Sequence, residues 1–344
     1  MTRMSGWTGF FAMVAAGLLL LLGLPQVLDL FGIVQMTVFV AMAMFALSQG
    51  FLWGYGGIMS FGQAAFLGIG GYAYAIAALN LGDSTLPVVI AILAPMLFAA
   101  LLGYFMFYGR ISDAYIGVIT LTVSVILFEL INSTSGNAYH IGSAELGGFN
   151  GIPAVPPLNF PGDPSDALSP EQTWYAAMGS LIGVYALLSA ILASRFGRVV
   201  VAIRENETRA MLLGYDPRLY KLLTFIIAAG AAGLAGCLYT IWGGFISPTV
   251  FSLTMSAQVI IFVLVGGLGT LLGPILGAVG IQYLIILAGS QNMVDSNLGL
   301  GVVLVAFVLL VPQGIVPTIR DRLLPIRGSA PRERPATETA EARQ

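Results

Sequence analysis

Apolar residues in this chain gather into long runs, and short polar segments separate the runs. A run of about 20 apolar residues crosses a bilayer as one helix, which satisfies its own backbone hydrogen bonds where lipid cannot. We therefore predict an all-α integral membrane protein, a polytopic bundle of about ten transmembrane helices. The predicted spans are Phe10–Leu28, Ile33–Leu52, Gln63–Asn80, Leu86–Tyr108, Ala114–Asn132, Trp174–Ser194, Leu222–Trp242, Met255–Val265, Pro274–Ala288 and Leu298–Val311.

Composition agrees with this pattern and excludes several functions. Of the 344 residues, 58% are hydrophobic and only 9% are charged, which excludes an ordinary soluble domain. One cysteine, Cys237, excludes an internal disulfide, and one histidine, His140, argues against a metal cluster. The only lysine, Lys221, does not stand in a phosphate-binding loop. We expect no catalytic site, no cofactor or metal bound by this chain, and no nucleic-acid partner.

Charge then orients the predicted spans. Cytoplasmic loops of membrane proteins carry an excess of Lys and Arg. With the N-terminus inside, alternating ten spans places all 14 Lys and Arg residues on the cytoplasmic side, whereas the opposite loops hold acids only. Both termini are then cytoplasmic, and the first span is a retained helix rather than a cleaved signal.

Two segments differ from the spans in composition. Residues 133–173 form one long external loop rich in Gly, Pro, Ser and Asn. Such a loop either meets a soluble partner, caps an entry, or is a spacer folded over the external face. Residues 321–344 lack an apolar face, so we predict a disordered cytoplasmic tail after a transmembrane domain over 1–320.

A short sequence recurs between the two halves of the chain. Gly56–Ser60 reads GGIMS before the third span, and Gly243–Ser247 reads GGFIS before the eighth. If spans one to five and six to ten are equivalent, their topologies are opposite, which is typical of an inverted repeat with a pathway between the halves. The alternative is a chance match in a chain with 43 glycines.

Six of the 14 basic residues lie in one internal segment, the basic loop (residues 195–221). We predict a short helix over Glu205–Leu213, with Glu205 and Arg209 paired on one face and Gly214 as its stop. Asp216 and Pro217 read as the N-cap and first residue of the next helix. Such a helix suits docking into a groove of another protein; the alternative is an amphipathic helix lying on lipid headgroups. We interpret Arg195, Arg198 and Lys221 as topology anchors.

The order Glu207, Arg209, Ala210 and Gly214 resembles the coupling motif of ABC importer permeases. The stretches Ile203–Gly236, Gly54–Ala73 and Val265–Ala278 resemble permeases of the branched-chain amino acid importer family, over about Gln35 to Arg320. Thr208 departs from the motif, which often has Glu or Ala there. Permeases for urea and short amides belong to the same family, and Leu52–Tyr55 and Gly269–Leu271 are similar to theirs.

The resemblance implies a bacterial inner-membrane subunit that pairs with a second homologous permease as a heterodimer. It also implies two cytoplasmic ATPases that use ATP, and a periplasmic solute-binding protein. The short helix of the basic loop, with Glu205, Glu207, Arg209, Ala210 and Gly214, would then be the coupling helix. Branched-chain amino acids are the preferred solute, and urea or short amides are the alternative.

Candidate residues for a translocation pathway are few. Ser60 and Gln63 stand in a Gly-rich stretch where a broken helix would line a cavity, although tight helix packing explains the glycines equally well. Thr120 lies in the fifth span, where its hydroxyl can also bond back to its own helix. Glu129 is the one carboxylate predicted within a span, where a charge is costly in lipid; the alternative is that it is solvated, since it lies a few residues from the external end, near Asn132 and Ser133. It keeps open a different class, a proton- or ion-coupled secondary transporter.

Overall fold

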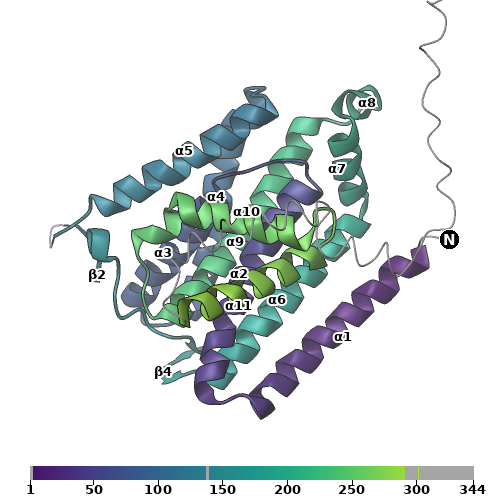
Figure 1. Cartoon of the computed structure of the whole chain (residues 1–344). Coiled ribbons are helices and arrows are strands. Elements are labelled where there is room, and N and C mark those ends of the chain that lie inside the picture. The colour runs from purple at the N-terminus through teal and green to yellow at the C-terminus, as the bar shows by residue number, and fades with distance from the viewer. Residues whose placement is uncertain (1–2, 137–138, 291–300, 302–344) are drawn as a thin grey trace, which may run out of the picture.

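The computed structural model describes residues 3–136, 139–290 and 301, which form a bundle of helices (Figure 1). Each of the first nine predicted spans corresponds to one helix. These are α1 (Arg3–Val27), α2 (Leu30–Gly54), α3 (Gln63–Leu81), α4 (Thr85–Tyr108), α5 (Asp113–Asn132), α6 (Pro170–Ala193), α9 (Pro217–Gly243), α10 (Leu253–Gly266) and α11 (Leu272–Ser290). The tenth span, apart from Gly301, and the predicted tail lie outside the described residues.

Six of the described helices, α2 to α6 and α9, are long and apolar enough to cross a membrane. The prediction of a mostly helical polytopic membrane protein is therefore confirmed. The smaller elements are two helices in the basic loop, α7 (Arg195–Glu205) and α8 (Glu207–Leu212), and the short helices η1 (Gly148–Asn150) and η2 (Pro248–Phe251). The described residues also form four short strands: β1 (His140–Ile141), β2 (Ala144–Glu145), β3 (Asn159–Phe160) and β4 (Asp163–Ala167).

Local capping determines where several helices begin. The Asp29 side chain accepts a hydrogen bond from the Gly32 amide at the start of α2, at 3.0 Å. Ser169 and Gln172 form a reciprocal capping box around the first turn of α6. These side chains satisfy amides that have no partner inside the helix, which is why short polar residues mark helix starts.

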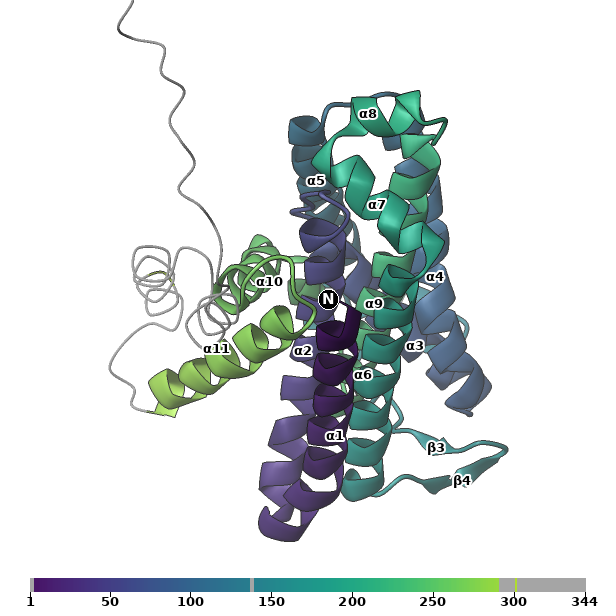
Figure 2. The ribbon, with the colours of Figure 1, turned by 90° about the vertical axis from the view of Figure 1, so that its right-hand side faces the viewer.

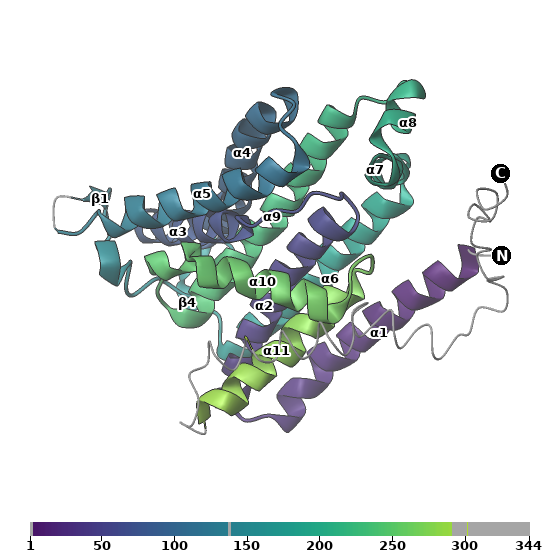
Figure 3. The same ribbon diagram turned by 45° about the horizontal axis from the view of Figure 1, so that its top comes forward.

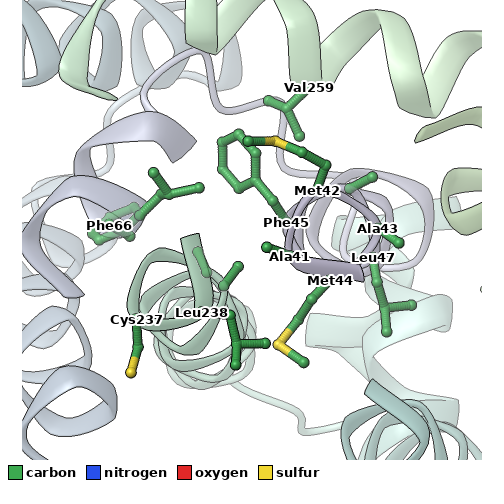
Figure 4. Close-up of a cluster of buried hydrophobic side chains, with 14 of the residues drawn as sticks. Ala41, Met42, Ala43, Met44, Phe45, Leu47, Phe66, Cys237, Leu238 and Val259 are labelled. Carbon is green, nitrogen blue, oxygen red and sulfur yellow. The ribbon is translucent and has the colours of Figure 1, made fainter. Parts of the chain in front are cut away.

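The centre of the bundle consists of α2, α3 and α9. Between 61% and 67% of the residues in their apolar windows are buried, against 22% to 28% in α4, α5 and α6. Figure 4 shows Met44 of α2 next to Leu238 of α9, and the ring of Phe45 beside Met42 on another face of α2. Phe66 of α3 meets Phe225 of α9 edge to face, with ring centroids 5.1 Å apart. The lightly buried outer helices are the ones that lipid or another subunit would cover.

The packing order of the first half recurs in the second half. The first half has α1 to α5, and the second half has α6, α9, α10, α11 and the tenth span. Helix α4, the fourth span of the first half, packs on α3 and on α9, the second span of the other half. Helix α11, the fourth span of the second half, likewise packs on α10 and on α2, the second span of the first half. Figure 3 displays α10 and α11 on one side of α2. Gly82 and Gly269, which precede α4 and α11, both have positive φ, at 71° and 81°.

The predicted external loop folds back over one end of the bundle. Its strands form two hairpins, β1–β2 and β3–β4. The Asn80 amide at the end of α3 donates to the Ile141 carbonyl at 2.8 Å, and the Ser84 amide donates to the Asn159 side chain at 2.6 Å. The backbones of Ile152 and Ile246 also pair. The observed loop is thus anchored to the helices that it covers, and the β3–β4 hairpin projects beyond them (Figure 2).

Candidate functional site

The basic loop stands at the end of the bundle opposite to this folded loop (Figures 1 and 2). The prediction of one helix over Glu205–Leu213 is wrong in its boundaries. Glu205 is the last residue of α7, and α8 covers Glu207–Leu212. The cause is Asn206, whose extended backbone ends α7 and whose side chain accepts from the Arg209 amide at 2.8 Å. Asn is among the strongest N-caps, so Asn206 followed by an acid was a readable signal.

The predicted stop at Gly214 is confirmed. Gly214 has φ of +87°, its amide donates to Met211 at 2.9 Å, and the Tyr215 amide donates to Ala210 at 3.2 Å. These are the two hydrogen bonds of a Schellman cap, which needs a residue in the left-handed region and so favours glycine. Asp216 then caps α9 by accepting from the Arg218 amide at 3.1 Å, with Pro217 as first residue, as predicted.

Ion pairs in the loop differ from those expected. Glu205 pairs with its neighbour Arg204 and not with Arg209, because Asn206 separates the two helices. Glu207 instead pairs with Lys221, with 2.7 Å between Oε2 and Nζ. Lys221 also lies 3.3 Å from Oδ1 of Asp113, the first residue of α5. The interpretation of Lys221 as only a topology anchor is therefore incomplete, since it joins three helices.

A second contact ties the loop to the glycine-rich stretch. Arg204 of α7 donates from Nη1 to the carbonyl of Gly54, the last residue of α2. Its stem covers Gly57, where an added β-carbon would lie 2.7 Å from the Arg204 Cγ. Gly57 has φ of +71°, a conformation that favours glycine, and a side chain at this position would also collide with the Arg204 stem. A small hollow beside the contact is lined by Gly56, Val200, Ile203, Tyr220, Lys221 and Thr224.

Helix α8 has an inner and an outer face. Ala210 is buried against Val199 and Ile203 of α7 and the ring of Tyr220. Met211, Leu212 and Leu213 point the other way, with exposures of 49%, 83% and 73%. The short helix thus carries an exposed apolar end on a base held by packing and ion pairs. Such a surface suits either a groove in another protein or a lipid headgroup layer.

Three of the four pathway candidates lie close together. Ser60 belongs to the first connector (residues 55–62), which joins α2 to α3, and Gln63 and Thr120 lie beside it. Ser60 and Gln63 are fully buried, and the Gln63 amide donates to Ser48 Oγ at 3.2 Å. Thr120 of α5 accepts a hydrogen bond from the Phe61 amide at 3.2 Å. Glu129 stands apart from them, on the exposed face of α5.

The set of buried polar residues around the first connector includes a residue that the sequence did not suggest. Gln49 of α2 donates to the Ser60 carbonyl at 2.9 Å. Within the described residues, Oε1 of Gln49 and Oε1 of Gln63 are buried without a hydrogen-bond partner. Unpaired buried acceptors are costly, so an ordered water at each of these two oxygens would stabilise the structure. Gln49 was missed because it lies inside a predicted span, with no local signal of a role.

Comparisons with known proteins match most of the chain. Residues 32–311 match the family model described as branched-chain amino acid transport system / permease component. The chain is 30% identical over 310 residues to the high-affinity branched-chain amino acid transport system permease protein LivM of Escherichia coli K12, a match that covers 80% of this chain and 68% of the relative.

Other relatives show how far the similarity extends. The LivM protein of Salmonella typhimurium is 31% identical over 304 residues, covering 78% of this chain and 66% of the relative. The inner membrane ABC transporter permease protein YjfF of Escherichia coli is 31% identical over 145 residues, covering 39% of this chain and 44% of its own. No solved structure matches the chain.

Proposed function

The chain belongs to the family of branched-chain amino acid transport permeases, and from this premise we propose that it forms the translocation pathway for branched-chain amino acids. It is the transmembrane permease subunit of an ABC importer. A transport permease is not expected to catalyse a reaction. We propose that separate ATPase subunits use ATP and that this chain binds no cofactor itself. Urea or short amides are the alternative solutes, and solute binding by the external partner would distinguish them.

Helix α8 is the proposed contact with an ATPase subunit. The observation that carries this proposal is its exposed apolar end, Met211 to Leu213, on a helix stopped by Gly214. The ion pair between Glu207 and Lys221 attaches the first turn of α8 to the first turns of α9, so a displacement of α8 should also displace the helices of the bundle. Arg209 and Ala210 lie on this helix, and Glu205 precedes it.

We propose that the α7–α8 end faces the cytoplasm, with both termini, in a bacterial inner membrane. All 14 Lys and Arg residues fall on that side of ten alternating spans. The full set of partners would be a second homologous permease in a heterodimer, two cytoplasmic ATPases, a periplasmic solute-binding protein and lipid. The anchored loop over the opposite end, 133–173, would meet the solute-binding protein.

An inverted repeat of five helices is the proposed internal organisation. The recurring packing of α4 on α9 and of α11 on α2 supports it. So do three sequence features, each of which recurs after the same number of residues: the pairs Gly56 and Gly243, Gly82 and Gly269, and Pro87 and Pro274. A constant separation over this stretch argues against a chance match of glycines. Solving the structure of the tenth span would test the repeat, because it must pack as α5 does.

The proposed pathway includes the exposed face of α5. Thr122 and Glu129 lie on that face, and a carboxylate facing lipid is costly, so the second permease or water should cover it. The buried group of Ser60, Gln63 and Thr120 lies behind the same helix. In the assembled transporter, Thr122→Cys should react with a water-soluble maleimide and Leu97→Cys of α4 should not. The native thiol of Cys237 is buried, so we expect it not to react with the maleimide. Equal labelling of the two variants would contradict this pathway.

The coupling proposal is tested by Gly214→Pro in the complete transporter. Proline cannot adopt the left-handed φ of Gly214 and has no amide for the cap, so α8 should lose its position. We expect ATP hydrolysis to continue without solute uptake, and Gly214→Asn, which tolerates this φ, to keep uptake. Normal uptake by Gly214→Pro would overturn the proposal. Proton-driven uptake by this chain alone in vesicles would instead favour a secondary transporter.

A further inference from the structure

We propose that Lys221 is a positioning residue that transmits movement of α8 to α5. This inference rests on the proposed contact between α8 and an ATPase. Lys221 is the only lysine of the chain, and its ammonium group bonds Glu207 of α8 at 2.7 Å and Asp113 of α5 at 3.3 Å. Lys221 itself belongs to α9, so one side chain connects three helices.

The environment of Lys221 makes this link stronger than an ordinary surface ion pair. Its side chain is 14% exposed, whereas Glu207 and Asp113 are 43% and 65% exposed. A partly buried charge is less screened by salt than an exposed one. A lysine ammonium has three donors on a flexible stem, so it can bond two carboxylates from different directions.

Helix α5 is the element best suited to respond. Only 22% of the residues in its apolar window are buried, the lowest share among the six candidate spans, whereas 67% of those in α9 are buried. A helix with few packing contacts moves at lower cost than one in the core. Displacement of α8 should therefore shift the start of α5 through Asp113 while α9 stays in place.

Movement of α5 would reach both irregular connectors. Thr120 accepts from the Phe61 amide in the first connector, at 3.2 Å. Ser124 donates to the Phe251 carbonyl in the second connector (residues 244–252), which joins α9 to α10, also at 3.2 Å. The two hydroxyls lie four residues apart on one face of α5, and both are buried. The path thus runs from Glu207 through Lys221 and Asp113 to the two connectors that carry the recurring GG sequences.

The test uses the complete transporter in proteoliposomes and measures solute imported per ATP hydrolysed. Lys221→Met should lower this ratio about tenfold, the factor that corresponds to about 1.4 kcal/mol, which is near the lower end for one hydrogen bond to a charged group. Asp113→Asn should act in the same direction while leaving the basic loop unaltered. Lys221→Arg keeps the charge and should restore part of the ratio. The matched control is Arg218→Met, which removes one positive charge from the same helical turn.

Each outcome separates the two proposals. If Gly214→Pro lowers the ratio and Lys221→Met does not, transmission through Lys221 is wrong and coupling by α8 stands. If neither variant changes the ratio, coupling by the loop itself is wrong, and the role of Lys221 with it. If Lys221→Met only reduces co-purification of the ATPases, and the complexes that form keep a normal ratio, Lys221 merely stabilises the loop and the inference is overturned.

Discussion

Gly233 of α9 lies directly against Pro95 of α4, and a β-carbon on Gly233 would stand 2.3 Å from the Pro95 Cγ atom. A similar contact in the other half joins Gly50 of α2 to Pro274 of α11, again at 2.3 Å. Both glycines sit in the central helices of the bundle. Close approach of small residues is what associates helices in a membrane, where lipid tails remove the hydrophobic driving force.

Replacing Gly233 with valine should therefore push α4 away from α9. Overpacking of this kind costs about 1–3 kcal/mol, so we expect a lower thermal midpoint in detergent. The control is Gly183→Val in α6, where nothing beyond the adjacent residues and the backbone of α6 lies within 4 Å of the added β-carbon. Both sites are helix interiors, so the propensity cost of valine is shared. Equal stability of the two variants would rule out a close Gly233–Pro95 contact.

Thr120 should be required for the position of the first connector. Its hydroxyl accepts from the Phe61 amide, and Thr120→Val removes that acceptor with little change of shape. An amide left without its partner in a buried site costs about 1–3 kcal/mol. Thr37→Val is the control, because that buried hydroxyl bonds the Ile33 carbonyl of its own helix. We expect lower stability and slower uptake in Thr120→Val alone, by chemical unfolding and transport assays. Matching losses in both variants would argue against the prediction.

The parts of this architecture that sequence could predict are those set by local signals. The Gly214 stop and the Asp216 cap were read correctly because the residues that form them are neighbours. The break at Asn206 was missed because Glu205 to Leu213 are good helix formers, and a single cap outweighs their propensity.

Contacts between residues that are distant in the sequence could not be predicted from local sequence patterns. Lys221 and Asp113 are 108 positions apart, and Arg204 and Gly54 are 150 apart. Sequence indicated that these charges lie on one side of the membrane, but their partners depend on how α5, α7 and α9 pack. The pathway roles of Ser60, Gln63, Thr120 and Glu129 stay predictions, because burial and hydrogen bonding alone do not identify the residues that a solute touches.

Asp83 should make the anchor of the β3–β4 hairpin sensitive to acid. Hydrogen bonds from the Thr85 amide and then from the Asn159 side chain hold the pKa of Asp83 below its ordinary value. A lowered pKa means that the anchor is complete above the usual carboxyl pKa of about 4 and is lost as pH falls through the lowered value. We expect hydrogen exchange of residues 157–168, corrected for the intrinsic rate, to rise below pH 4. Asp83→Asn should remove this pH dependence, and an unchanged profile in that variant would exclude Asp83 as its source.

We expect that no other residue, including lysine, can replace Arg204. It donates from Nη1 to the Gly54 carbonyl and from Nε and Nη2 to Glu205, which uses the planar fork of the guanidinium in two directions. Lysine keeps the charge but places its donors at one point, so Arg204→Lys can satisfy one partner and not both. The Gly54 carbonyl at the end of α2 has Arg204 as its donor, and without Arg204 the first connector loses its tie to α7. We expect Arg204→Lys to reduce uptake while leaving the amount of protein in the membrane unchanged.

The control is Arg198→Lys, because lysine can replace the one hydrogen bond that the Arg198 guanidinium donates, to the Ala193 carbonyl. Full uptake by Arg204→Lys would mean that the tie to α2 has no part in transport.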